Sequence, residues 1–193
     1  MSPASAVQPV GPVAENVTIV QEQTQEIALL KKFNITNPLA NKEDTVKLEE
    51  ESRAKKAQAI DAYFKKYDMP LAGHGMKMVI EAEKNDLDWR LLPAIAVRES
   101  TGGKHACKKV TNSFFGWGSC KINFKTIDHA IEIVAHNLGG NNPNTDHYYA
   151  DKTTYEILQT YNPPSIVKRY AEQVINIMDV IGSEEANTIA SNT

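Results

Sequence analysis

The sequence has no apolar run of the length that a membrane-spanning helix needs. About 18 consecutive apolar residues are required to cross the hydrocarbon core, and no such run occurs in the 193 residues. We also find no basic segment followed by an apolar one at the start, so we expect no secretory signal peptide in this chain. With 41% hydrophobic and 23% charged residues, the composition is typical of one soluble domain with or without a tail.

An excess of positive charge is likewise missing. The formal net charge is −3, whereas proteins that bind nucleic acids need a basic stripe to neutralise phosphates. We therefore expect no nucleic-acid partner.

Metal-binding patterns and activated nucleophiles are not recognisable either. The five histidines are scattered, and no third ligand with zinc spacing accompanies His129 and His136. No serine or cysteine lies in the context of a nucleophile elbow. We expect neither a metal nor another cofactor.

There are only two cysteines, Cys107 and Cys120, which lie 13 positions apart without a CxxC motif. They are either a disulfide pair or two unrelated reduced thiols, and their place in one loop segment favours the disulfide. Closing this loop would stabilise the fold by roughly 3 kcal/mol. A disulfide favours an oxidising, extracytoplasmic location.

Composition divides the chain into four parts. Residues 1–44 are rich in Pro, Ser, Ala and Val or in polar residues, which predicts a flexible tail with at most a short helix around residues 22–33. Residues 45–58 predict a solvated lead-in helix. Residues 59–182 predict the folded domain, and residues 183–193 a C-terminal tail.

The domain is predicted to be mainly α-helical. Apolar residues at helical spacing predict helices over residues 76–84, from Leu91 onward, over 127–138 after the capping residue Thr126, and over 153–161. A last helix is expected after Ser165, with Ile166 and Tyr170 on its buried stripe and Gly182 at its end. The loop over residues 100–125 allows at most a small β-hairpin within residues 106–123.

Glu99 is the first residue that could perform chemistry. It continues the apolar face formed by Leu92 and Ile95, because these positions are three and four residues apart on a helix. A carboxyl group taken out of water is held more easily in its protonated form, which suits a general acid. The alternatives are a salt bridge with Arg98 or Lys104, or a solvent-exposed helix end.

Two aromatic segments are further candidates. In the run from Phe114 to Ser119, bulky rings lie between Gly116 and Gly118, where the backbone can approach a ligand closely. We expect Phe114 in the core and Trp117 at a ligand. Tyr161, just before Asn162 and two prolines, is either a rigidly presented phenol that contacts a carboxyl group or a substrate, or a core tyrosine.

These segments follow one another as LLPAIAVRESTGGKH, NSFFGWGS and TYNPPS. In this order they resemble the lysozyme-like superfamily, in particular soluble lytic transglycosylases and bacterial β-N-acetylglucosaminidases of the mannosyl-glycoprotein endo-β-N-acetylglucosaminidase-like type. There an apolar helix ends in Glu-Ser, here Glu99 and Ser100, and an Ala-Tyr-Asn-like segment closes the cleft. The segment YNPPSIVKRYAEQVINIMDVIG is similar to the terminal helix of these families. The resemblance covers residues 59–182.

The resemblance implies a helical, lysozyme-like fold with a cleft between two lobes. It implies that Glu99 protonates a glycosidic oxygen and that Tyr161 orients Glu99 or stabilises the transition state. The expected substrate-binding residues are Ser100, Phe115, Gly116, Trp117, Gly118, Tyr149 and Asn162. The expected substrate is a β-1,4-linked amino-sugar polymer such as peptidoglycan, cleaved by a monomeric extracytoplasmic glycosidase.

The sequence departs from the family pattern in two ways. The middle motif is not the Gly-Leu-Met-Gln of typical transglycosylases, which counts against that activity. No second carboxylate stands out for a two-carboxylate mechanism; the candidates are Asp128, Glu132, Asp146, Asp151 and Glu156. A substrate-assisted route through the N-acetyl group needs none. The alternatives that remain are a lytic transglycosylase and an inactive glycan-binding or structural module.

Overall fold

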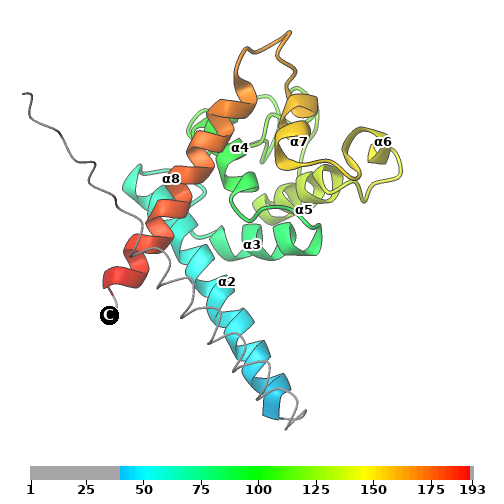
Figure 1. Ribbon diagram of the computed structural model, residues 1–193. Coiled ribbons are helices and arrows are strands. Elements are labelled where there is room, and N and C mark those ends of the chain that lie inside the picture. The colour runs from blue at the N-terminus through cyan, green and yellow to red at the C-terminus, as the bar shows by residue number, and fades with distance from the viewer. Residues whose placement is uncertain (1–39, 192–193) are drawn as a thin grey trace, which may run out of the picture. The chain divides into compact units, whose positions relative to one another are not determined.

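The computed structural model describes residues 40–191, with the side chains of residue 42 and of residues 44–185. Within this part the chain is mainly α-helical, as expected, and forms seven helices and no strand (Figure 1). The hairpin allowed within residues 106–123 is not formed, and the segment consists of turns and irregular backbone. The helices are α2 (Ala40–Lys66), α3 (Gly75–Lys84), α4 (Leu91–Ser100), α5 (Ile127–Leu138), α6 (Asp146–Tyr149), α7 (Thr154–Tyr161) and α8 (Tyr170–Ser191).

Helix α2 begins before the expected end of the tail. Residues 1–39, including the short helix predicted near residues 22–33, lie outside the described part, whereas residues 40–44 are helical. The predicted lead-in helix over residues 45–58 is part of α2. From residue 49 onward the described part of the chain forms one compact unit, and within it α2 starts to enter the core at Ala57.

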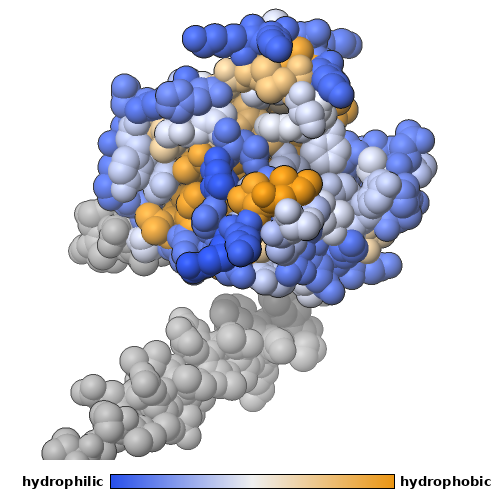
Figure 2. All heavy atoms as spheres, turned by 90° about the horizontal axis from the view of Figure 1, so that it is seen from above, coloured by the Kyte–Doolittle hydropathy of each residue, from blue (hydrophilic) through white to orange (hydrophobic). Residues whose placement is uncertain are grey.

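Helix α4 lies at the centre of this unit. Its residues from Leu91 to Ala96 are all buried, because the helix packs against α8 and against α3 (Figure 1). Helix α7 packs against α8, and α5 against α3. Polar residues cover most of the face seen in Figure 2, and apolar residues reach the surface there only in patches. No described helix is long and apolar enough to span a membrane.

The helix starts follow local chemistry. Thr126 caps α5, because its hydroxyl accepts a hydrogen bond from the backbone N–H of His129 at 3.0 Å. Thr153 and Glu156 form a capping box at α7. Pro93 is the third residue of α4, where a backbone N–H has no partner within the helix, so the proline is tolerated.

The last helix differs from the expectation at both ends. Helix α8 begins at Tyr170 rather than after Ser165, because Arg169 has a left-handed backbone with φ of 60° that interrupts the helix. Ile166 is consequently 75% exposed rather than buried. The helix also continues past Gly182 to Ser191, through part of the predicted C-terminal tail, because Gly182 keeps helical geometry instead of the left-handed conformation of a terminating glycine.

Candidate functional site

Glu99 lies in the last turn of α4, and a tyrosine from α8 holds its carboxylate. The hydroxyl of Tyr170 donates a hydrogen bond to Glu99 Oε1 at 2.6 Å. Burial, together with the hydrogen bond to Glu99, raises the pKa of Tyr170, so its phenol stays protonated and serves as a donor. Tyr170 is 1% exposed, whereas Glu99 is half-buried.

The alternative ion pairs of Glu99 do not form. Arg98 donates from Nε to Oε1 of Gln173 at 2.8 Å, and its guanidinium lies 5.5 Å from the ring centroid of Tyr170. Lys104 is exposed and has no acidic partner within the described residues. Tyr170 is therefore the polar side chain that fixes the carboxyl group of Glu99.

The second carboxylate oxygen of Glu99 faces Gly116. A Cβ built on Gly116 would overlap Glu99 Oε2 and would lie 3.0 Å from Glu99 Cδ. Gly116 also has φ of 69°, a left-handed conformation that favours glycine. The glycine thus lets the loop backbone reach the carboxyl group, for two independent steric reasons.

Tyr161 does not bind Glu99, so it does not orient the carboxyl group directly, and the other role that the resemblance implies, stabilisation of the transition state, stays a prediction. The hydroxyl of Tyr161 donates to the backbone carbonyl of Phe115, and its ring stacks on Tyr170 with centroids 6.0 Å apart and planes at 18°. Burial, and then the charge of Glu99, raise the pKa of Tyr161 well above its ordinary value. Tyr161 therefore supports both the loop and the tyrosine that holds Glu99.

Two of the expected substrate-binding side chains are in the core instead. Phe115 is fully buried and Phe114 is only partly buried, the reverse of the expected order. Ser100 is 3% exposed. Its hydroxyl lies 2.7 Å from the carbonyl oxygen of Phe114 and accepts from the N–H of Gly103 at 3.0 Å. These bonds tie the loop to the end of α4, and the buried position of Ser100 keeps its hydroxyl away from the surface.

A pocket of about 340 Å³ lies beside Glu99 and is lined by Gly116, Trp117, Gly118, Ser119, Tyr149 and Tyr161. The ring centroid of Trp117 is 5.8 Å from that of Tyr161 and 6.0 Å from that of Tyr149. Burial, with a smaller contribution from Tyr148, raises the pKa of Tyr149 to about 12. Glu99 is not among the lining residues, but its Oε2 faces Gly116, which is one of them. Asn162 ends α7 and is not among the lining residues.

None of the candidate second carboxylates lines this pocket. Asp128 bonds to His74 at 2.9 Å, Glu132 lies 3.9 Å from Lys77, and Asp146 bonds to the N–H of His147 at 2.6 Å. Glu156 forms the capping box of α7. Asp151 lines a second pocket of about 200 Å³, which shares Tyr149 with the first. Among the described residues there is also no cluster of three or more side chains that could hold a metal ion.

The two cysteines lie at disulfide distance, with Cα atoms 5.9 Å apart, as the sequence predicts. They close the loop that contains the pocket-lining residues 116–119. Four left-handed residues follow one another closely at this point, with φ of 69° at Gly116, 69° at Gly118, 51° at Ser119 and 60° at Cys120. Conformations of this kind in Ser119 and Cys120 cost energy, and the cross-link offsets it.

No protein-family model, no curated protein and no solved structure matches the chain.

Sequence reasoning missed Tyr170 as a site residue, although it placed this tyrosine on the buried stripe of the last helix. A buried tyrosine needs a partner for its hydroxyl. That requirement could have marked Tyr170 as a candidate site residue. Its partner, Glu99, lies 71 residues away in the sequence and is identified only in the folded chain.

Proposed function

We propose that this protein cleaves a β-1,4 linkage between N-acetylated amino sugars in peptidoglycan, with Glu99 as general acid. The observation that supports this proposal is the position of the Glu99 carboxyl group. Tyr170 binds its Oε1, and its Oε2 faces Gly116, which lines an aromatic pocket. The proposal includes a lysozyme-like arrangement in which this pocket belongs to a cleft between two helical lobes.

In the proposed reaction a sugar ring stacks on Trp117, whose flat face suits the apolar side of a pyranose. Glu99 transfers a proton from Oε2 to the glycosidic oxygen, and the bond between C1 and that oxygen breaks with its electron pair on the leaving sugar. Tyr170 keeps donating to Oε1, so the carboxylate that forms is stabilised by a charge-assisted hydrogen bond.

The positive charge at C1 needs a nucleophile. No carboxylate lines the pocket, so we assign this role to the carbonyl oxygen of the substrate's own N-acetyl group, which forms a cyclic intermediate. Water then attacks C1 and gives its proton to Glu99, which restores the acid and yields a reducing end.

The same observation favours a second outcome. If a hydroxyl group of the same sugar attacks C1 in place of water and gives its proton to Glu99, the product is an anhydro sugar and the reaction is that of a lytic transglycosylase. Mass spectrometry distinguishes the two, because an anhydro end is lighter by one water than a reducing end.

The test is Glu99→Gln against purified cell-wall sacculi, with Glu132→Gln as control because Glu132 is an exposed glutamate on α5. We expect Glu99→Gln to lose turnover with an unchanged unfolding temperature, and Glu132→Gln to keep it. Digestion by Glu99→Gln at the rate of the parent would overturn the proposal. Tight binding of sacculi by the parent without product at any pH would identify a glycan-binding module instead.

We place this activity outside the cytoplasm. The support is the cysteine pair at disulfide distance, since such bonds persist in oxidising compartments.

A further inference from the structure

The loop between α4 and α5 has a charge unlike the rest of the chain. It contains five lysines and one histidine and no acidic residue, in a protein whose net charge is −3. The lysine loop is defined here as residues 101–126. Its five lysines, all exposed, are Lys104, Lys108, Lys109, Lys121 and Lys125.

No acidic side chain of the described residues neutralises these lysines. Elsewhere some cations have acidic partners, as Arg53 has Glu83 at 2.5 Å and Lys66 has Glu184 at 2.6 Å. The acidic residue that follows the loop, Asp128, is bonded to His74. Like charges that face water without partners repel one another, so they favour an anionic partner over the isolated protein.

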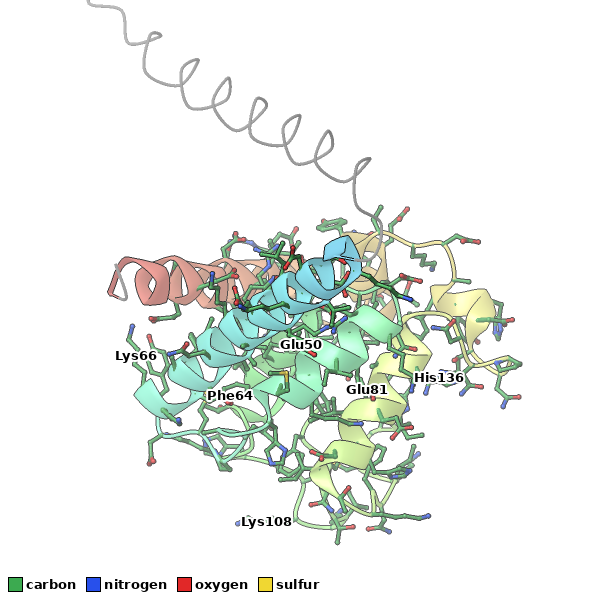
Figure 3. The ribbon with its side chains drawn as sticks, turned by 90° about the horizontal axis from the view of Figure 1, so that it is seen from below. Glu50, Phe64, Lys66, Glu81, Lys108 and His136 are labelled. Carbon is green, nitrogen blue, oxygen red and sulfur yellow. A yellow bond between two sulfur atoms is a disulfide. The ribbon has the colours of Figure 1, made fainter. Side chains whose placement is uncertain are left out.

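Two cross-links gather the lysines. The pair Cys107–Cys120 brings the backbone next to Lys108 close to that next to Lys121. The N–H of Thr111 donates to Asn123 Oδ1 at 2.9 Å, and the N–H of Phe124 donates to the carbonyl of Thr111 at 3.1 Å. These bonds join the segment after Lys109 to the segment before Lys125. Figure 3 shows Lys108 at the outer edge of the loop, away from the helices.

The lysine loop is also a wall of the pocket. Gly116, Trp117, Gly118 and Ser119 line it, and Cys120 and Lys121 follow directly. A polymer bound in the pocket therefore lies against the same loop that carries Lys121, and the cross-links above hold the segments with the other lysines to this loop.

We propose that the lysine loop binds carboxylates attached along the glycan that occupies the pocket. The protein would then select an anionic amino-sugar polymer with carboxylate-bearing peptide branches over a neutral β-1,4 amino-sugar polymer. This inference rests on the proposed function, because it assumes that a glycan occupies the pocket. A single exposed ion pair contributes little, but several on one loop act together.

The experiment measures binding of the Glu99→Gln protein, which holds the polymer without cutting it. The three ligands are sacculi stripped of phosphate-bearing polymers, the same sacculi with their carboxylates amidated, and neutral chitin. The test variant adds Lys108→Gln, Lys109→Gln and Lys121→Gln. The control adds Lys47→Gln, Lys55→Gln and Lys65→Gln, which are exposed lysines of α2.

We expect the loop variant to bind stripped sacculi at least about tenfold more weakly than the control, with unchanged binding of chitin. Binding of stripped sacculi by the unsubstituted loop should weaken steeply between about 50 and 200 mM salt, where screening increases, and chitin binding should not. The protein with the unsubstituted loop should bind amidated sacculi as weakly as the loop variant binds stripped sacculi. The salt series needs no lysine variant, so it holds even if that variant folds poorly.

Equal binding by loop variant and control would overturn the inference, as would undiminished binding of amidated sacculi. If the protein binds untreated sacculi but not sacculi stripped of phosphate-bearing polymers, the lysines bind phosphate groups, and the assignment to carboxylates is overturned. Failure of the proposed function gives a different result: the parent would release no product from sacculi, while lysine-dependent binding persists.

Discussion

Tyr170 donates a hydrogen bond to Glu99 across the contact between α8 and α4, at 2.6 Å. This bond links the terminal helix of the domain to the proposed acid. It also leaves Glu99 Oε2 directed toward Gly116, at the edge of the aromatic pocket. The proposed chemistry thus depends on a side chain that does not line the pocket itself.

Tyr170→Phe should lower kcat by roughly ten- to a hundredfold, because a hydrogen bond to a charged group contributes about 1.5–3 kcal/mol. KM should change little, since Tyr170 does not line the pocket. The matched control is Tyr155→Phe, which removes another tyrosine–glutamate bond, to Glu172 at 3.2 Å, away from the site. Steady-state kinetics on solubilised glycan strands measure both, and an equal effect of the two variants would contradict the role of Tyr170.

Gly116→Ala should abolish activity, because its Cβ would overlap the carboxylate of Glu99. It should also destabilise the fold by about 1–2 kcal/mol through its left-handed backbone. Gly73→Ala is the control, since Gly73 has φ of 98° and nothing within 4 Å of the added Cβ. Gly73→Ala should lower the free energy of unfolding by a similar amount but leave the activity unchanged. Retained activity in Gly116→Ala would show that the contact with Glu99 is not needed.

The double variant Cys107→Ser, Cys120→Ser should lose about 3 kcal/mol of unfolding free energy, the value for a loop of this length. Activity should fall as well, because the disulfide closes the loop that contains Trp117. Denaturant unfolding with and without reductant is the measurement. Reductant should destabilise the parent and leave the double variant unchanged; a parent that is insensitive to reductant would argue against the bond.

Asp88 makes stability depend on pH. Burial raises the pKa of its carboxyl group, but hydrogen bonds from Arg90 outweigh this and hold the pKa below its ordinary value. The stabilisation is therefore present above the ordinary value of 3.8 and is lost as pH falls through the lower folded value. Asp88→Asn should be less stable than the parent at pH 7.

The difference between Asp88→Asn and the parent should shrink toward pH 2, as urea unfolding at the two pH values would show. Asp86→Asn is the control, because Asp86 is exposed and forms no ion pair within the described residues. A difference for Asp88→Asn that stays the same at both pH values would contradict the assignment.

Local features of the fold were readable from sequence. Thr126 caps α5 as predicted, because a cap depends on residues three positions apart. The helix predicted over residues 153–161 forms as α7, which Thr153 caps. The apolar stripe of α4, with Leu92 and Ile95, is buried, because helical spacing alone decides which residues share a face. The sequence-based prediction placed the start of α8 too early, because no residue type at position 169 signals the left-handed backbone that Arg169 adopts.

The sequence by itself determined a mainly helical domain, the proposed acid at the end of an apolar helix, and a cysteine pair around an aromatic loop. Only the tertiary structure decided that Tyr170 rather than Tyr161 holds Glu99, and that Phe115 and Ser100 belong to the interior. The reason is physical. Periodicity and capping arise from neighbours along the chain, whereas the partner of a hydroxyl group depends on how helices distant in sequence pack.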